Sequence, residues 1–203
     1  MNLTMKSILM LAVLFVYQAA ASPESNPHQF IDNRAQAMVT VITSNQSLYA
    51  SNPDQFKEKI NAIFEPMVDF RTVGRLVMGK KLYSSATKEQ RTKFIAVFRT
   101  SLLENYSSTL AQWGDQTIET TFPDKVIFNK IEGVRQNLIT SNNRYPITYK
   151  VRNDGEGNWL IINIIVNGVN LGMTFRNHFQ ALASEHNKNI DDIISHWTSD
   201  ANF

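Results

Sequence analysis

Histidines and paired carboxylates are the side chains of this 203-residue sequence that could support metal or acid–base chemistry. Its four histidines fall outside HExxH spacing and it contains no cysteine, so no zinc or soft-metal ligand set can be recognised from spacing. His178 and His186 could share one face of a helix. Surface or hydrogen-bonded structural histidines explain them better. The sequence therefore predicts no metal site and no catalytic histidine.

The carboxylate and glycine clusters also have ordinary structural explanations. Asp191 and Asp192 stand where a helix is expected to begin, and the helix dipole stabilises negative charge there. Segment 154–157, DGEG, lacks the preceding strand and following helix of a phosphate-binding loop and fits a hairpin turn instead. No G-x-S-x-G, P-loop or G-x-G-x-x-G motif is present. We therefore expect no catalytic residues.

The charge balance excludes some partners. The formal net charge is only +2, and no stripe of Lys and Arg is interleaved with aromatic residues, which argues against nucleic acid. The same balance argues against strong adhesion to anionic lipid. Seven Lys and Arg residues are spread between Arg71 and Lys93. They leave two readings open: a solvated helix face, or a surface that docks a partner or faces a lipid headgroup.

The first residues have the pattern of a secretory signal peptide. Lys6 gives a positive start, residues 8–17 form a short apolar run, and Ala19 and Ala21 fit an A-x-A cleavage site. We predict a signal peptide at 1–21, with cleavage after Ala21. A membrane anchor is the alternative, but the apolar run is shorter than the roughly twenty residues that a span needs. A secreted chain without cysteine must be stabilised by burial alone, which a chain of this size can achieve.

Residues 27–113 have helical periodicity. Pro27 opens the first helix, and the others follow cap residues that can accept hydrogen bonds from the free N–H groups of a first turn. The predicted caps are Asn52, Asp69 and the capping box Thr87-x-x-Gln90, and the predicted stops are Pro66, Gly79 and Gly114. The last of these helices, which runs to about Gln112, is the longest. Its apolar stripe includes Phe98, Leu102, Tyr106 and Leu110.

From residue 116 the period changes to alternation, which indicates a sheet. The predicted strands are residues 116–122, 125–131, 135–140, 145–153, 158–167 and 169–173. Short connections such as Asn167-Gly168 are typical of hairpins, so the sheet should be antiparallel. Helices return at 175–198, with Asn189 as a cap. We predict an α+β fold in one domain, residues 22–203, with a helical part (27–113), a sheet (116–174) and C-terminal helices (175–198).

One face of the predicted sheet is strongly apolar. Residues Leu160, Ile162, Ile164 and Val166 are all aliphatic at even positions, and the neighbouring strand alternates in the same way from Tyr145 to Val151. Such a face, opposed to the stripe of the long helix, could fill a solid core or line a ligand cavity. Both need the same residues, so composition and periodicity leave the two open.

Three blocks of sequence, in order, carry a resemblance to a known family. The first is residues 70–79, FRTVGRLVMG; the second runs from Ser84 through the capping box to Leu110; the third is residues 159–171 with Phe175-Arg176-x-x-Phe179. With the signal peptide, they resemble the periplasmic phospholipid-binding proteins of the Mla pathway, the MlaC or toluene-tolerance auxiliary family. The resemblance covers essentially all of the mature chain.

The chain departs from the family pattern at several positions. Members often carry Asp, an acidic residue and Ser where this chain has Asn163, Asn167 and Asn170, and Trp near Leu82-Tyr83. These changes affect polar positions that could take part in docking. The aliphatic face and Arg176 remain. The apolar chemistry that holds lipid is therefore expected to be present.

The resemblance implies a fold and a role. The fold is a highly curved antiparallel sheet of the nuclear-transport-factor-2-like (NTF2-like) kind, capped by helices and enclosing an apolar cavity. The role is that of a monomeric periplasmic carrier with no catalytic activity and no cofactor, with phospholipid as its bound ligand. It would shuttle glycerophospholipid between an outer-membrane MlaA–porin complex and the MlaD component of an inner-membrane Mla ABC transporter, and so maintain outer-membrane lipid asymmetry.

Twelve residues are predicted to contact the lipid, chosen by the face on which they lie. They are Phe98, Leu102, Tyr106, Leu110, Tyr149, Val151, Ile162, Ile164, Val166, Val169, Leu171 and Met173. Two alternatives remain at this point. An enzyme of the same fold would need ionisable groups that converge inside the sheet, and a solid-core periplasmic chaperone module would have no internal cavity.

Overall fold

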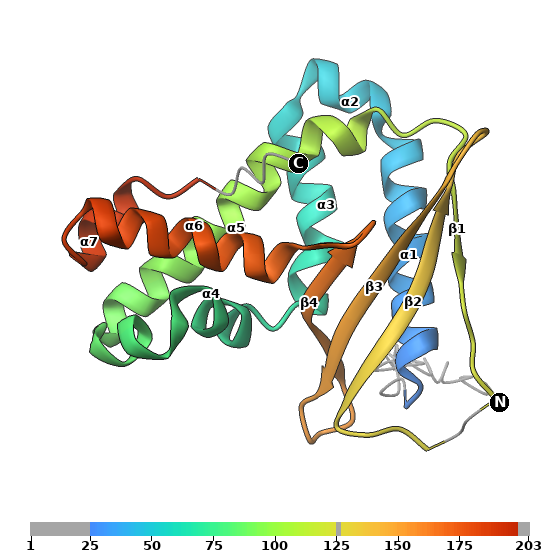
Figure 1. Ribbon diagram of the computed structural model, residues 1–203. Helices are drawn as coiled ribbons and strands as arrows, with labels where there is room; N and C mark the ends of the chain where they lie inside the picture. Colours follow the sequence, from blue (N-terminus) through green and yellow to red (C-terminus); the bar gives the residue numbers. More distant parts are fainter. Residues whose placement is uncertain (1–24, 125–126, 199–203) are drawn as a thin grey trace, which may run out of the picture.

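The computed structural model describes residues 25–124 and 127–198, and it places a layer of helices against a five-stranded antiparallel sheet (Figure 1). The predicted signal peptide lies outside the described residues. The helices are α1 (Pro27–Ser44), α2 (Gln46–Ser51), α3 (Pro53–Met67), α4 (Phe70–Ser85), α5 (Lys88–Ala111), α6 (Leu171–Glu185) and α7 (Ile190–Ser195). The strands are β1 (Thr117–Thr120), β2 (Ile131–Ile139), β3 (Arg144–Asn153), β4 (Trp159–Val166) and β5 (Val169–Asn170). Within these ranges, no helix is long and apolar enough to cross a membrane.

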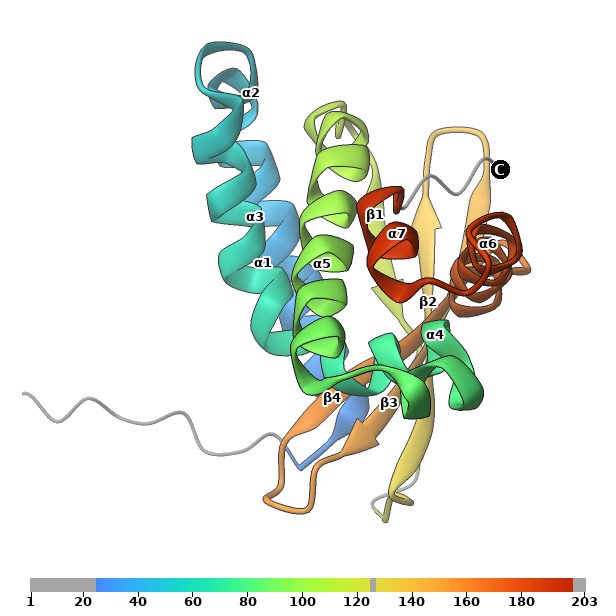
Figure 2. The ribbon, with the colours of Figure 1, turned by 90° about the vertical axis from the view of Figure 1, so that its left-hand side faces the viewer.

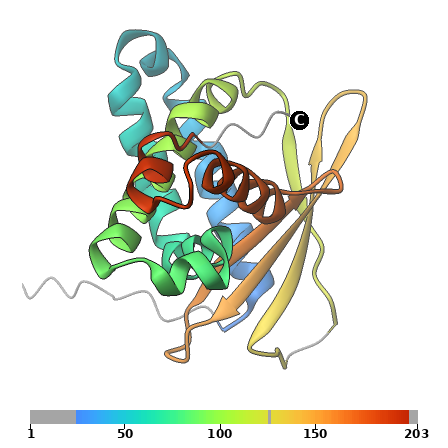
Figure 3. The same ribbon diagram turned by 60° about the vertical axis from the view of Figure 1, so that its left-hand side comes forward.

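The strands lie across the sheet in chain order, and the helices form two groups. The strands follow one another across the sheet as β1-β2-β3-β4-β5, so each connection is local. Helices α1, α3 and α5 run side by side (Figure 2) and form the layer that faces the sheet, while α4, α6 and α7 gather beyond β4. The other face of β2 and β3 has no described helix over it (Figures 1 and 3). The α+β class and the antiparallel sheet are thus as the sequence predicts.

The predicted helix starts are confirmed by their caps. The side chain of Asn52 accepts a hydrogen bond from Gln55 N at 3.1 Å, and that of Asp69 accepts one from Thr72 N at 2.9 Å. Thr87 and Gln90 form the reciprocal capping box that opens α5. These bonds satisfy first-turn N–H groups that have no partner within their own helix.

Two predicted helix ends are wrong. Helix α3 continues through Pro66 to Met67, so the proline does not end it. At Gly79 the chain leaves the helical conformation, with φ +73, but helical turns then resume to Ser85. The Gln180 side chain donates to Met78 O at 3.0 Å, which satisfies a carbonyl at the break. Glycine tolerates the positive φ, so it forms a kink here where the sequence predicts a stop.

The sheet also corrects two strand predictions. Residues 131–139 form one strand where two were predicted, at 125–131 and 135–140, and residues 127–130 lie outside any strand. Gly133, part of the predicted break, instead pairs with Lys150 inside the β2–β3 ladder. The predicted strand 169–173 stops after two residues, because the Asn170 side chain accepts from Met173 N at 3.1 Å and caps α6. Leu171 and Met173 therefore lie on a helix, which begins at 171 where 175 was predicted.

A β-bulge interrupts the apolar face of β4. Val151 pairs with Ile161 and Lys150 with Asn163, so Ile162 has no partner across the ladder. The bulge shifts the alternation by one residue. Tyr149 lies opposite Ile164, whereas beyond the bulge it is Ile161 that joins the buried side with Val151. The predicted unbroken face from Leu160 to Val166 is therefore split at the bulge.

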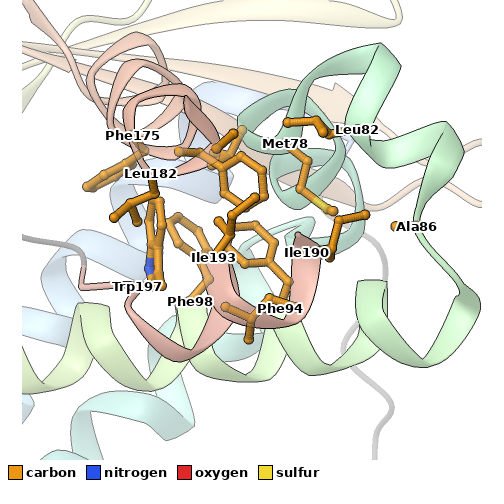
Figure 4. Packing of buried hydrophobic residues seen from close by; sticks show 14 of the residues in the cluster. Met78, Leu82, Ala86, Phe94, Phe98, Phe175, Leu182, Ile190, Ile193 and Trp197 are labelled. Atoms are coloured by element: carbon orange, nitrogen blue, oxygen red, sulfur yellow. The ribbon is translucent and has the colours of Figure 1, made fainter. Parts of the chain in front are cut away.

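The largest buried cluster lies away from the sheet, among α4, α5, α6 and α7 (Figure 4). Several of its aromatic rings pack edge to face: Phe94 lies 4.9 Å from Phe179 and 5.2 Å from Trp197 between ring centroids. The Trp197 indole N–H donates to Ser101 Oγ at 3.1 Å. This cluster packs α5 against the C-terminal helices.

Side chains and loops cover the edges of the sheet. On β1 and its extension, Gln36 Nε2 donates to Ile118 O at 3.3 Å, and His28 Nδ1 lies 2.9 Å from Thr121 O. At the other side, Asp69 N donates to Ile161 O at 3.0 Å, and Val68 forms a parallel bridge with Ile161. The backbone groups that an open sheet would leave free at these points therefore have partners.

Candidate functional site

A cavity of 920 Å³ lies between the helical layer and the sheet and opens to solvent. This volume is near the upper end of the roughly 300–1,000 Å³ typical of small-molecule sites. Its walls come from α1, α3, α4, α5 and α6 and from all five strands. Most of the lining side chains are aliphatic or aromatic. A solid-core module, the third reading of the sequence, is incompatible with such a cavity.

Helix α5 forms one wall because its apolar residues recur every fourth position and so share a face. Phe98, at 1% exposure, belongs both to the aromatic cluster and to the cavity wall. Leu102, Tyr106 and Leu110 continue along the wall and are only half-buried. The stripe thus changes from core to cavity along the length of one helix.

The structure brings eleven of the twelve predicted residues together around the cavity. They are Phe98, Leu102, Tyr106, Leu110, Tyr149, Ile162, Ile164, Val166, Val169, Leu171 and Met173. Val151, the twelfth, is fully buried with Val134, Trp159 and Ile161 under the start of α1 and is not among the lining residues. That any of these side chains touches a ligand remains a prediction.

Many of the lining residues are not among the twelve predicted from the sequence. Most of them lie on helices, where an apolar stripe indicates burial but does not distinguish a core from a cavity wall. These lining residues are Ile31, Ala35, Met38, Ile42, Ile60, Phe64, Met67, Val73, Leu76 and Val77, with Ile118, Leu138 and Ile147 from the sheet. Their helical spacing was visible in the sequence. The distance between the helical layer and the sheet was not.

The polar groups on the wall are mostly neutral. Burial raises the pKa of Tyr149 to about 12, so its phenol is uncharged at physiological pH. Amides of Gln112, Gln116, Asn167 and Asn170 also belong to the lining. No Asp, Glu or His is found among the described lining residues. The described wall therefore offers no carboxylate or imidazole for general acid–base catalysis.

A small hydrogen-bond network holds the start of α6 beside the cavity. Asn163 Nδ2 donates to Asn170 Oδ1 at 3.0 Å, and Gly172 N donates to Asn163 Oδ1 at 3.0 Å. A Cβ atom at Gly172 would lie 2.5 Å from Asn163 Oδ1, so a side chain there would collide with the amide. Two of the asparagines that depart from the family pattern, Asn163 and Asn170, thus bond to each other and tie the β4–β5 hairpin to the start of α6.

Exposed apolar side chains surround the opening. Met173 is 54% exposed, Leu76 43% and Val169 37%, and all three also line the cavity. Large apolar side chains at the rim of a cavity mark a surface where a hydrophobic ligand or partner can enter.

The family of the chain follows from comparison with known proteins. A model of the MlaC protein family matches residues 32–199. The chain belongs to the MlaC family. The recognition made from the three sequence blocks is therefore confirmed.

Individual MlaC relatives match over most of their length. The toluene tolerance protein Ttg2D of Pseudomonas putida is 29% identical over 192 residues, covering 94% of this chain and 88% of that protein. The intermembrane phospholipid transport system binding protein MlaC of Haemophilus influenzae is 25% identical over 160 residues, covering 77% and 74%. A solved structure of a phospholipid-binding protein from Ralstonia solanacearum, in complex with a phospholipid, matches with a TM-score of 0.75. It is 20% identical and covers 83% of this chain and 92% of its own, so it supports the MlaC fold.

Proposed function

We propose that this chain is a periplasmic phospholipid carrier. It would move glycerophospholipid between outer-membrane and inner-membrane complexes and so maintain the lipid asymmetry of the outer membrane. The observation that carries the proposal is the open 920 Å³ cavity with its apolar lining. The names of the Haemophilus and Ralstonia relatives point to the same class of ligand.

The apolar wall explains how a soluble protein can hold such a ligand. Each buried methylene is worth about 0.8 kcal/mol, so a two-chain lipid of roughly thirty methylenes would lose on the order of 20 kcal/mol or more in water. A wall built from residues such as Leu102, Ile164 and Val166 offsets nearly all of that loss. Exchange with a bilayer or a partner then has little intrinsic direction. Net direction must come from the partners, for instance from ATP used at the inner membrane.

The polar lining suggests where the headgroup lies. Gln112, Gln116 and Asn167 are neutral and are exposed or half-buried. They can hydrogen-bond to a hydrated headgroup without selecting its charge. A headgroup held at the mouth in this way makes the carrier tolerant of headgroup type.

The partners belong to the proposal as well. They are the MlaA–porin complex at the outer membrane and the MlaD component of the inner-membrane ABC transporter, each meeting a monomeric carrier. Of the basic run, Arg71, Arg75, Lys80 and Lys81 are exposed and free to meet an acidic partner surface. Arg91 is not, because its guanidinium donates to the carbonyls of Tyr83 and Ala86 at 2.8 and 2.9 Å.

An enzyme is the competing reading, since curved sheets of this kind also host small-molecule catalysis. It would need ionisable groups that converge in the cavity. The cationic lining residues Arg34, Lys150 and Arg176 have no carboxylate or imidazole beside them in the described lining. The carrier therefore explains the described wall better.

The test is the lipid content of the purified protein. We expect protein from a bacterial host to carry phospholipid, detected by native mass spectrometry and by extraction with thin-layer chromatography. Delipidated protein should take up phospholipid again from vesicles. A well-folded preparation that is empty and takes up no lipid would overturn the proposal.

A further inference from the structure

Arg34 is a cationic side chain on the α1 wall of an otherwise apolar part of the cavity. Ile31 and Met38, about one turn to either side, and the adjacent Ala35 line the same wall. The other cationic residues of the described lining, Lys150 and Arg176, are exposed, whereas Arg34 is only partly so. Of the three, Arg34 is the one whose charge is partly removed from water.

The guanidinium of Arg34 lacks an anionic partner. Its Nε atom is buried and has no hydrogen-bond acceptor, and within residues 25–124 and 127–198 Arg34 forms no ion pair. The guanidinium carbon lies 5.7 Å from the centroid of the Phe30 ring, a contact that attracts the cation but accepts no in-plane N–H bond. A buried charged donor without an acceptor is unfavourable.

The nearest acidic residue in sequence is already engaged elsewhere. Asp32 accepts a hydrogen bond from Thr120 Oγ1 at 2.7 Å, on the side of α1 that faces β1. Gln36 also faces β1, through its bond to Ile118 O. Asp32 and Gln36 thus bond to β1, whereas Arg34 lies on the cavity wall.

We propose that Arg34 binds the anionic oxygens of an acidic, acyl-chain-bearing ligand inside the cavity. A fatty-acid carboxylate held there leaves the neutral mouth to phospholipid headgroups, whereas a phosphate held there would move the headgroup from the mouth to Arg34. The Nε–H and one terminal N–H of a guanidinium form a fork that matches two oxygens of a carboxylate or phosphate. The acyl chain would lie on the adjoining aliphatic wall. Two sources supply this chemistry: the carboxylate of a free fatty acid, and the phosphate of a phospholipid. The inference rests on the proposed function for the acyl-binding wall and adds an acid-selective group to it.

The experiment compares acids with neutral analogues of the same chain length. Delipidated protein would be titrated with hexadecanoic acid and with 1-hexadecanol in a displacement assay at neutral pH. A second arm compares dipalmitoyl phosphatidic acid with dipalmitoylglycerol. The variants are R34Q, R34K and, as a matched control, K59Q, which removes an exposed charge on α3. Thermal melting of each variant checks folding.

We expect wild-type protein to bind the acid at least about tenfold more tightly than the alcohol, the gain typical of a charge-assisted hydrogen bond. R34Q should abolish this preference by weakening the acid alone, R34K should keep part of it, and K59Q should keep all of it. The arm in which the preference appears identifies the source, carboxylate or phosphate.

Other outcomes overturn the inference. Equal binding of acid and alcohol by wild-type protein, or an acid preference that survives in R34Q, removes the role of Arg34. A uniform loss for acids and neutral analogues in R34Q shows that Arg34 is structural. If neither wild-type protein nor any variant binds an amphiphile, the proposed function fails together with the inference; if phospholipid loads without acid preference, the inference alone fails.

Discussion

Asp69, the cap of α4, forms an ion pair with Arg152 of β3 and so joins the α3–α4 connection to the sheet. The backbone N–H of Asp69 adds a hydrogen bond of 3.0 Å to Ile161 O on β4. Burial alone would raise the pKa of the Asp69 carboxyl. Hydrogen bonds from Thr72 and Arg152 outweigh that effect, and the pKa of the Asp69 carboxyl lies below its ordinary value of 3.8.

Substitutions at Asp69 can separate the cap from the ion pair. D69N keeps an oxygen for Thr72 N but loses the charge that faces Arg152, and D69A loses both. We expect D69N to lower the free energy of unfolding by about 1–3 kcal/mol, because Arg152 is left without its counter-ion, and D69A to lower it by a further ~1 kcal/mol. Chemical denaturation measures both. Equal stability of D69N and wild-type protein would show that the pair contributes nothing.

The same pair predicts a dependence on pH. A carboxyl whose pKa is lowered on folding contributes its full stability above the unfolded-state pKa, near 3.8, and loses it as the pH falls through the lower folded-state value. The difference in melting temperature between wild-type protein and D69N should therefore be constant near neutral pH and shrink below pH ~4. A difference that persists in acid would assign the effect to something other than ionisation.

The cavity wall on β4 can be tested with two neighbouring residues. Val166 lines the cavity, whereas Ile165, the next residue on the strand, does not. V166D should abolish lipid loading in native mass spectrometry, because a carboxylate among acyl chains is costly to bury. I165D places the same charge on the opposite face of the strand and should still load lipid. L171D tests the α6 wall in the same way, and loading that survives both V166D and L171D would show that the wall is wrongly assigned.

The contact between Gly172 and Asn163 predicts a strong coupling. G172A places a Cβ atom 2.5 Å from Asn163 Oδ1 and should destabilise the protein by about 1–3 kcal/mol. N163A should cost about 1 kcal/mol through the lost hydrogen bonds. In the double variant the collision is gone, so its loss should be smaller than the sum of the single losses. Additive losses in a denaturation cycle would mean that the two residues do not meet.

Tyr149 predicts a loss of stability in alkali. Its pKa is raised by burial from 10.0 to about 12, so the unfolded chain loses the phenolic proton more readily than the folded protein. The contribution is fully present below pH 10 and is lost as the pH rises toward 12. Y149F should remove this component, which is visible as a smaller fall in stability over that range. The same fall in both proteins would assign it to other groups.

The helix starts could be predicted because their signals are local in the sequence. The β4 bulge and the start of α6 could not be predicted in the same way, because they depend on tertiary pairing and on competing local signals. The caps at Asn52, Asp69 and Thr87 act within one turn, so they can be recognised without knowing the fold. The bulge at Ile162 depends on how β4 pairs with β3. The start of α6 at Leu171 depends on the Asn170 cap, which competed with a run of β-forming residues.

The cavity itself could not be predicted from periodicity. Phe98 and Leu102 lie on one stripe of α5, yet Phe98 is packed among aromatic rings while Leu102 is half-buried on the open wall. Phe98 packs against rings that lie far away in sequence, Phe175 at 5.4 Å and Trp197 at 5.8 Å between centroids. The resemblance to the MlaC family, which rests on whole segments, predicts a cavity, whereas the periodicity of single residues leaves a core and a cavity equally open.

The covered edges of the sheet matter most when the cavity is empty. An empty cavity leaves its apolar wall open to water, and exposed apolar strands can pair with other chains and polymerise. Polymerisation needs free backbone groups as a template. Gln36 bonds to Ile118 O of β1, His28 lies against Thr121 O just after this strand, and Asp69 N bonds to Ile161 O of β4. These contacts therefore oppose edge-to-edge pairing of two sheets while the cavity is empty.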